Sequence, residues 1–393
     1  MTILGSGNDV YGGIYQATAS GAIADGKACM INADGTVSVG SAQAGKVIYQ
    51  LQTQLMTRYS LENAYDPTLT TSGSYSAANT ANSYKDSQSS ELAANTTELQ
   101  AISFNPDGTK AFFIDSNVTN SKIQEFTLST AYDPSTLVYV DGHTIGNVSS
   151  ARYPRGMDFK PDGTEVYVCS IAYSDIHQYT LSTAWDISTA SSTRSFDTTR
   201  TNYNHGIRFK PDGTKMYTVG GASTESESDQ YSLSTAWDIS TASYESTLAH
   251  SSYNSLPEDN MFNNDGTKYY VLGSSVTEII TYSLTTAYDL STASYVSETP
   301  LYLSAVKGFS FGPGAVSDAQ YIGMSVGSVS DGATASIRVV GGLDTNQSGL
   351  TPNAACYVTL DGAVTSTNTG GAQIGWALTP TTVLIRGSYK NIL

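Results

Sequence analysis

The chain has 393 residues, enough for about two or three domains, and its 19 Lys and Arg stand against 35 Asp and Glu, a formal net charge of −16. Phosphate contacts need clustered cations and the sequence has no basic patch, so we expect no nucleic-acid partner. There is no apolar run of about eighteen residues, and MTILGSGNDVYGG (1–13) lacks the features of a secretion signal, so we expect no membrane insertion.

Residues 1–50 are poor in Tyr and rich in Ala, Gly, Val and Thr. Within them, ADGKACMINADGTVSV (24–39) predicts a short strand with a cysteine, followed by an Asp-Gly hairpin. The same order recurs in residues 318–393, as TPNAACYVTLDGAVTS (351–366). We therefore predict that 1–50 and 318–393 are the two halves of one small β-domain, divided by the insertion of residues 51–317.

The three cysteines, Cys29, Cys169 and Cys356, are far apart in the sequence and lie in different segments. No Cys-x-x-Cys pair or Cys/His cluster exists, so no zinc site is predicted. Cys29 and Cys356 occupy matching positions in the two terminal segments. A disulfide between them is one interpretation, but the pattern favours two small buried thiols.

Residues 51–317 contain a phrase that recurs four times: FNPDGTKAFFI (104–114), FKPDGTEVYVC (159–169), FKPDGTKMYTV (209–219) and FNNDGTKYYVL (262–272). A second phrase follows each one and also stands alone at the start: YSLENAYDPTL (59–69), FTLSTAYDPST (126–136), YTLSTAWDIST (179–189), YSLSTAWDIST (231–241) and YSLTTAYDLST (282–292). A period near fifty residues in a strand-rich sequence is the signature of a repeat architecture.

Each first phrase predicts a β-hairpin, because alternating apolar residues flank a turn with the sequence Pro-Asp-Gly or Asn-Asp-Gly. Proline sets the first turn position, the aspartate side chain can cap the turn, and glycine supplies the positive φ that follows. We therefore expect the aspartates of these turns to be structural rather than ligands or catalysts: Asp107, Asp162, Asp212 and Asp265.

The second phrase supplies a third strand, as in DQYSLS (229–234), and the segment after it supplies a fourth, as in ISTASYEST (239–247). Four short antiparallel strands per repeat make one blade of a β-propeller. The aromatic residue just after each third strand is expected to wedge between adjacent blades: Tyr132, Trp185, Trp237 and Tyr288. Stacking of these rings on sugars is the alternative, and their regular recurrence favours packing.

The order of the phrases predicts how the ring closes. Residues 59–75 hold a third and fourth strand without partners, and LSAVKGFSFGPG (303–314) reads as a degraded first strand. A blade shared by both ends removes open sheet edges. We thus predict an all-β protein, a propeller of about five blades inserted into a small β-barrel or β-sandwich domain. The Ser/Asn/Ala-rich residues 76–100 are either a long loop or a strand pair that changes the count.

The sequence contains no H-E-x-x-H helix, and its two G-x-S-x-G matches, GFSFG (308–312) and GMSVG (323–327), are not followed by a predicted helix as a nucleophile elbow would be, so we predict no catalytic residue, no metal site and no cofactor. Arg155, His205 and Glu258 precede the first strands of successive blades. They are expected near the axis, either as a glycan or metal pocket or, as we favour, as a solvated rim. TESESDQ (224–230) fits no calcium-loop spacing, so we expect a solvated acidic loop.

Tyrosines recur in the loops before the first strands, in SSARYPRG (149–156), TNYNHG (201–206) and SSYNSLPED (251–259). Tyr153, Tyr203 and Tyr253 hold equivalent positions and His205 lies beside them, so these side chains are expected on one face. Tyrosine, serine and asparagine make adaptable contact surfaces. This face is our candidate for binding a partner. The alternative is that the tyrosines pack between loops.

The hairpins within residues 59–314 resemble those of bacterial propellers of the lactonase and translocation-associated types, which implies a fold and no particular activity. The rear segment resembles the small β-barrel modules of capsid decoration proteins and short fibre proteins of tailed bacteriophages. That likeness is carried by SDGATASIRVVGG (330–342), SGLTPNAACYVTLDGAVTST (348–367) and AQIGWALTPTTVLI (372–385). Asn353 and Ala354 depart from the glycine and small polar residue usual there.

The phage resemblance implies a non-enzymatic virion structural protein, a capsid decoration protein or head fibre, assembled in the host cytoplasm and carried on the virion surface. Its terminal β-domain would bind the major capsid protein or another virion protein. The tyrosine face would bind a host-surface glycan or protein. Symmetric sites on a particle favour a homo-oligomer such as a trimer. Two alternatives stay open: a receptor-binding tail fibre, and a propeller-fold glycan hydrolase or lactonase.

Overall fold

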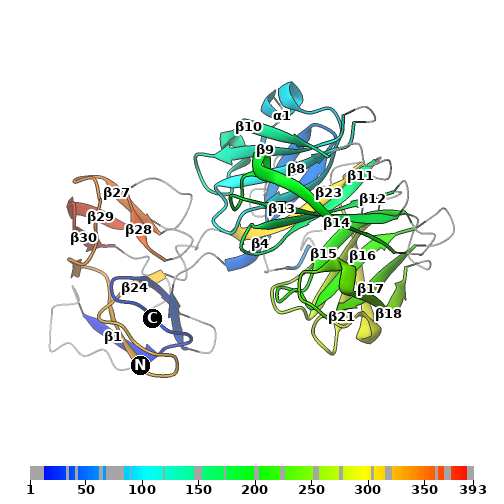
Figure 1. Cartoon of the computed structure of the whole chain (residues 1–393). Helices are drawn as coiled ribbons and strands as arrows, with labels where there is room; N and C mark the ends of the chain where they lie inside the picture. The colour runs from blue at the N-terminus through cyan, green and yellow to red at the C-terminus, as the bar shows by residue number, and fades with distance from the viewer. Residues whose placement is uncertain are drawn as a thin grey trace. The chain divides into compact units, whose positions relative to one another are not determined.

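The computed structural model describes residues 13–31, 35–39, 43–61, 65–67, 84–88, 90–117, 120–145, 153–171, 174–198, 203–221, 226–250, 256–273, 278–301, 305–314, 321–358, 362–366 and 373–386. The chain forms two compact units. One consists of Met1–Ala44 together with Pro313–Leu393, and the other is Gly45–Gly312. We call the first the terminal unit and the second the propeller (Figure 1).

The described residues of the propeller form five four-stranded antiparallel sheets, which confirms the predicted fold class (Figure 1). Four blades are continuous in sequence. Blade 1 contains β7 (Leu99–Phe104), β8 (Lys110–Asp115), β9 (Lys122–Leu128) and β10 (Leu137–Thr144). Blade 2 contains β11 (Pro154–Phe159), β12 (Glu165–Ser170), β13 (Asp175–Leu181) and β14 (Ala190–Asp197). Blade 3 contains β15 (Asn204–Phe209), β16 (Lys215–Gly220), β17 (Glu227–Leu233) and β18 (Ala242–Ala249). Blade 4 contains β19 (Pro257–Phe262), β20 (Lys268–Gly273), β21 (Glu278–Leu284) and β22 (Ala293–Pro300).

The fifth blade joins the two ends of the propeller segment. Its order is β23 (Gly308–Gly314), β4 (Gln43–Gln52), β5 (Leu55–Ser60) and β6 (Tyr84–Gln88), so its innermost strand comes from the far end of the segment. The chain therefore enters this blade at the second strand, whereas the sequence predicted entry at the third. The unit borders lie after Ala44 and Gly312, whereas the predicted borders follow residues 50 and 317.

The stretch between the first two repeats contains a strand and a short helix. Strand β6 completes the fifth blade, and α1 (Ser90–Asn95) buries Leu92 before the first strand of blade 1 begins. The wider repeat spacing at residues 76–100 therefore leaves the blade count at five. The fourth strand of this blade lies at residues 84–88, later than the predicted 59–75.

The turn of each first phrase is closed by its aspartate. In blade 3, Asp212 Oδ1 accepts hydrogen bonds from the backbone N–H and the hydroxyl of Thr214, at 3.0 and 2.6 Å. Gly213 follows with a φ of 73°, which strains any residue with a Cβ. The equivalent aspartates make the same pair of bonds in their own turns: Asp107, Asp162 and Asp265.

The aromatic residue after each third strand rests on the turn glycine of its own blade. Trp237 donates its backbone N–H to the Gly213 carbonyl at 3.0 Å, and a Cβ on Gly213 would come within 2.3 Å of its ring. The same arrangement recurs for Tyr132 on Gly108, Trp185 on Gly163 and Tyr288 on Gly266. All four aromatic residues have positive φ, so the repeat geometry rather than residue preference holds them there.

A ring of hydrogen bonds joins each blade to the next through these aromatic residues. The hydroxyl of Tyr217 in blade 3 donates to the carbonyl of Tyr288 in blade 4 at 2.6 Å. The other joints run from Tyr49 to Tyr132, Lys110 to Trp185, Tyr167 to Trp237 and Tyr270 to Tyr65. An equivalent bond therefore joins every pair of adjacent blades, including the pair that closes the ring.

A 3₁₀ turn separates the third and fourth strands of each continuous blade. Asp238 caps the turn Ile239–Thr241 of blade 3, where its side chain accepts from Ser240 N. The fourth strand β18 consequently begins at Ala242, three residues after the start predicted for it. Equivalent caps occur in the other continuous blades, at Asp133, Asp186 and Asp289.

The described residues of the terminal unit form two five-stranded sheets with the same topology. The first has the order β1 (Ile14–Thr18), β25 (Thr334–Arg338), β24 (Tyr321–Ser325), β2 (Ala28–Ile31) and β3 (Val37–Val39). The second has the order β26 (Leu343–Asp344), β30 (Thr382–Ile385), β29 (Gln373–Thr379), β27 (Ala355–Val358) and β28 (Val364–Thr365). We call these sheets the first copy and the second copy, because each has a lone strand and two hairpins in the same order.

Strand register shows that the two copies repeat one plan. Cys29 pairs with Gly323 in the first copy and Cys356 pairs with Gly375 in the second, and a bulge follows each cysteine. The motifs around the two cysteines, predicted to be halves of one domain, thus hold equivalent places in a duplicated module. The propeller interrupts the first copy, between β3 and β24. All three cysteines are free and buried.

The two copies share one hydrophobic core. One side of the first copy's sheet, with Ala28 and Met324, packs against second-copy residues such as Cys356 and Ile374. The opposite side of that sheet has its own cluster around Cys29. The sheet face that carries the cysteine, which we call the cysteine face, is therefore buried in each copy. The other face of the first copy's sheet is covered by the second copy.

Candidate functional site

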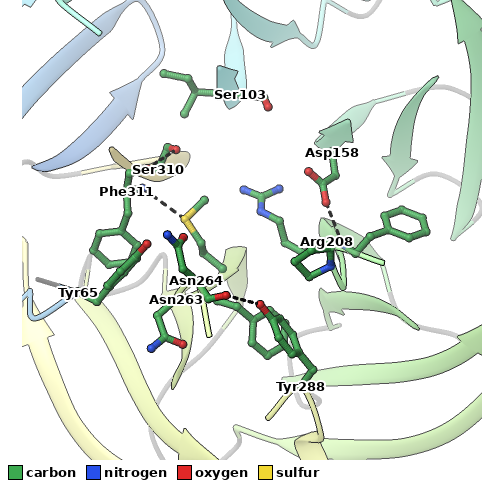
Figure 2. A pocket seen from close by; sticks show the side chains of 14 residues that line it. Tyr65, Ser103, Asp158, Arg208, Asn263, Asn264, Tyr288, Ser310 and Phe311 are labelled. Atoms are coloured by element: carbon green, nitrogen blue, oxygen red, sulfur yellow. Dashed lines mark hydrogen bonds between the residues drawn. The ribbon is translucent and has the colours of Figure 1, made fainter. Parts of the chain in front are cut away.

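A pocket of about 480 Å³ lies on the inner strands of the propeller (Figure 2). Each inner strand carries an equivalent phenylalanine, and Phe209, Phe262 and Phe311 line the pocket together with the residue that precedes each phenylalanine. These preceding residues line the pocket, one from each blade: Ser103, Asp158, Arg208, Met261 and Ser310. The pocket therefore lies where the five repeats meet, at the end of the strands that leads into the turns.

Arg208 is a buried cation at the wall of this pocket. Its Nη2 donates to both carboxylate oxygens of Asp259, at 3.1 and 3.3 Å, and its Nη1 donates to the carbonyls of Met157 and Ile207, each at 2.8 Å. Burial raises the pKa of Asp259, and the charge of Arg208 opposes that rise. Removing one partner of a buried ion pair lowers the stability of a protein by about 3–5 kcal/mol. The pair with Asp259 therefore holds the Arg208 guanidinium in place.

Asp158 faces the same pocket from the neighbouring inner strand, β11 (Figure 2). Its Oδ1 accepts the N–H of Phe159 at 3.0 Å and its Oδ2 accepts the N–H of Phe209 at 2.8 Å. Burial raises the pKa of Asp158 to about 6, against the opposing charge of Arg208 and the two backbone bonds. A carboxyl with this pKa can take up and release a proton near neutral pH.

Aromatic rings and neutral polar groups complete the pocket wall. The rings of Tyr65 and Phe311 contact each other, with centroids 5.3 Å apart, and the Phe311 N–H points at the Met261 sulfur at 3.3 Å. Tyr288 donates its hydroxyl to the Asn264 carbonyl at 2.8 Å (Figure 2). Aromatic faces beside amide and hydroxyl groups suit a compact polar ligand such as a sugar ring.

A charged cluster lies three residues earlier on the inner strands, toward their other end. Glu258 is 7 % exposed and contacts His205 Nδ1 at 3.2 Å and Lys307 Nζ at 2.7 Å. Despite burial, these two partners lower the pKa of Glu258 to about 2. Arg155, expected in the same cluster, instead lies 3.9 Å from Glu98.

The predicted tyrosine face lies at this second end of the strands, away from the pocket. Tyr153 and Tyr203 immediately precede β11 and β15, and 39 % and 47 % of their surfaces are exposed. Tyr253 lies outside the described residues. The structure thus places His205 and these two tyrosines at the same end of neighbouring inner strands.

The predicted acidic loop at 224–230 is part of a strand from Glu227 onward, because β17 begins there. Asp229 is 4 % exposed, and its carboxylate accepts the hydroxyl of Thr247. Among the residues that the structure describes, no group of three or more His, Cys, Asp or Glu is placed to hold a metal ion. None of the described helices is long and apolar enough to cross a membrane.

Ser228 and His250 form a pair that sequence motifs did not reveal. Ser228 Oγ lies 2.7 Å from His250 Nε2, and the hydroxyl of Tyr282 lies 2.8 Å from Nδ1. The arrangement has the elements of a nucleophile and base, but both residues are 0 % exposed. Burial lowers the pKa of His250 to about 3, so this histidine is neutral at pH 7. We interpret the pair as part of a buried polar network.

No family model matches the chain, and no curated protein matches it in sequence. The solved structures that resemble it include a putative 6-phosphogluconolactonase from Bacteroides uniformis, with 15 % identity, a TM-score of 0.39 and coverage of 69 % of this chain and 72 % of that one. The periplasmic gluconolactonase PpgL of Pseudomonas aeruginosa has 10 % identity, a TM-score of 0.42 and coverage of 77 % and 99 %. A nidogen/laminin complex has 11 % identity, a TM-score of 0.42 and coverage of 68 % and 97 %.

These likenesses concern the β-propeller fold alone. The expectation that this protein has no enzymatic activity is contradicted, because two of the similar structures are named as lactonases, and we do not retain it. None of the three structures is named as a phage protein.

Proposed function

We propose that the propeller is a hydrolase that cleaves a small sugar-derived ester or lactone in its axial pocket. The observation that carries this proposal is the carboxyl of Asp158, with a pKa of about 6, facing the same pocket as the fixed guanidinium of Arg208. A base poised near neutral pH beside a localised positive charge is the minimal equipment for adding water to a carbonyl group.

In the proposed reaction, ionised Asp158 removes a proton from a water molecule, and the water oxygen bonds to the ester carbonyl carbon. The charge of Arg208 stabilises the negative oxygen of the resulting tetrahedral intermediate. The bond between the carbonyl carbon and the ring or ester oxygen then breaks, and that oxygen takes the proton from Asp158. Asp259 acts through Arg208 by holding its guanidinium at the pocket wall.

The experiment is to incubate the full chain with a panel of aldonolactones and sugar esters and to follow acid release by pH-stat. Asp158→Asn is expected to lower kcat by about a hundredfold or more, the usual size of a lost general base. Asp107→Asn, which alters a turn aspartate of the same residue type, is the matched control and is expected to retain activity. The absence of turnover on every substrate, or full activity of Asp158→Asn, would contradict the proposal.

A second candidate function is display on a tailed-phage virion, as a capsid decoration protein or head fibre, with a tail fibre as the alternative location. It is favoured by the terminal unit, which has its own core, and by the exposed Tyr153 and Tyr203 on the propeller. In this proposal the terminal unit binds a capsid protein, and the tyrosine face contacts a host-surface glycan or protein.

Electron microscopy of phage particles labelled with antibody against the purified chain tests the second candidate. Label on heads supports decoration, label on tails supports the fibre alternative, and unlabelled particles contradict both. The lactone assay is independent of this result, because a hydrolase can act either free or on a particle.

A further inference from the structure

An apolar row crosses the exposed face of the second copy. Ala355 pairs with Trp376, Trp376 pairs with Leu384, and Leu384 pairs with Leu343, each across neighbouring antiparallel strands. Directly paired residues point to the same face of a sheet. Trp376 is 38 % exposed and Leu343 is 48 % exposed, and we call these four residues the Trp376 row. Large apolar side chains gathered in this way mark a contact surface.

The equivalent row of the first copy is covered over half of its length. Ala28 pairs with Met324, Met324 with Arg338, and Arg338 with Ile14, at the positions equivalent to the Trp376 row. Ala28 and Met324 are 0 % exposed, because the second copy packs against them. Within one chain, this position of the module is therefore an interface with another copy of the same module.

The charge distribution favours a second chain at the bare row. Residues 341–393 contain two aspartates and two basic residues, whereas the whole chain has a formal net charge of −16. Like-charged molecules repel each other least where the local charges balance. The second copy is thus the part of this acidic protein through which two chains can approach most closely.

We propose that two copies of this chain dimerise through the Trp376 row. The cysteine face of the second copy is filled by the first copy, and the cysteine face of the first copy is covered by its own buried cluster, so neither can receive the Trp376 row of another molecule. The Trp376 row instead meets the same row of the second molecule across a two-fold axis, which four apolar residues permit because they bring no like charges together. The interface buries Trp376 at its centre, where aromatic anchors contribute most.

Sedimentation equilibrium of the purified full chain tests the proposal, and a dimer is the expected result. Trp376→Glu places a charge in the row and is expected to weaken dimerisation by about thirtyfold or more, the effect of losing a binding hot spot. Tyr244→Glu, at a propeller tyrosine that is 47 % exposed, is the control and is expected to leave the mass unchanged. A wild-type monomer at about 100 μM, or a dimer that Trp376→Glu leaves intact, would overturn the proposal.

A thiol cross-link provides a second readout that does not depend on a charge in the sheet. The three native cysteines are buried, so Leu343→Cys introduces an accessible thiol at the end of the Trp376 row. A bifunctional maleimide is expected to convert this variant to a covalent dimer. Val326→Cys, at a first-copy residue that is 37 % exposed, is the matched control and is expected to stay monomeric on the gel. Equal cross-linking of both variants would count against the row.

Discussion

Asp158 differs from the turn aspartates of the same repeats in its protonation. Asp212 is only slightly buried, and hydrogen bonds from Lys210 and Thr214 lower its pKa to about 2. Burial destabilises the ionised form of Asp158 by more than the charge of Arg208 and the two backbone hydrogen bonds stabilise it, so its pKa rises to about 6. One residue type therefore serves as a fixed turn cap at one place and as a proton carrier at another.

The pKa of Asp158 determines the expected pH dependence of hydrolysis. Only ionised Asp158 can accept a proton from water, so kcat is expected to rise with pH through a midpoint near 6 and then to level off. Initial rates between pH 4.5 and 8 at saturating lactone, corrected for spontaneous hydrolysis, would show this. A flat profile over that range would argue against Asp158 as the base.

His250 makes the protein sensitive to acid. Its pKa is about 3 in the fold because of burial, so below its unfolded pKa of 6.5 the unfolded chain binds a proton that the native chain does not. Stability is therefore expected to fall as pH drops below 6.5, with a loss from this residue of about 2 kcal/mol at pH 5. Urea unfolding of the wild type at pH 7 and pH 5 measures the loss.

His250→Gln isolates this term, because glutamine does not titrate. Burial also lowers the pKa of His143 and His177, and the raised pKa of Asp158 acts in the opposite direction below pH 6, so all three contribute to both proteins. The variant is expected to be less stable at pH 7 but to lose less between pH 7 and pH 5. Equal losses in both proteins would mean that His250 is not buried as described.

In the sequence, only a difference between the repeats marks the pocket residues. The phrases around them are nearly constant, but the position before the phenylalanine is Ser103, Asp158, Arg208, Met261 or Ser310. Positions that pack between blades stay alike because each blade meets the same neighbour. The position that faces the pocket has no such constraint, and it carries the chemistry. Distances between strands of different repeats were needed to recognise Arg208 and Asp259 as a pair.

At the scale of elements, an equivalent hydrogen bond to a backbone carbonyl recurs at every joint between adjacent blades, and the bond from Tyr217 to Tyr288 is buried. Removing the hydroxyl in Tyr217→Phe leaves the Tyr288 carbonyl without that partner, and an unsatisfied buried acceptor costs about 1–3 kcal/mol. Chemical denaturation is expected to show a loss of stability in this range without a change in secondary structure.

Tyr244→Phe is the matched control for this joint. Its hydroxyl lies 2.8 Å from the Thr247 hydroxyl at the surface, so its removal is expected to change stability by less than about 0.5 kcal/mol. A similar effect of both substitutions would show that the Tyr217 bond does not stabilise the blade interface.

At the scale of the whole molecule, the sequence predicted the propeller and its five blades, because turn glycines and aromatic residues recur with each repeat. It missed β4, since the buried run Val47–Leu51 carries no repeat phrase. It also missed the duplication in the terminal unit. The two copies share hairpin order and bulges rather than many residues, and strand pairing is set by contacts that no local pattern records.

Closure of the ring by β23 predicts the outcome of truncation. A fragment of residues 43–307 lacks the inner strand of the fifth blade, so β4 keeps β5 but loses β23, and the inner edge of one blade is open. We expect this variant to unfold at lower urea concentration with a broad transition, or to aggregate through the free edge. A fragment of residues 43–314 keeps β23 and is expected to unfold cooperatively. Equal cooperativity of the two would show that β23 does not close the ring.

The insertion of the propeller within the first copy has a consequence for synthesis on the ribosome. Strands β1 to β3 emerge first, but β25, the partner of β1, and β24, the second partner of β2, are translated only after the whole propeller. Pairing across so long a separation is slow. Strand β1 and the free edge of the β2–β3 hairpin must therefore wait for their partners until the residues after the propeller are made. Chaperones that bind nascent chains are expected to act on this protein at its amino-terminal end.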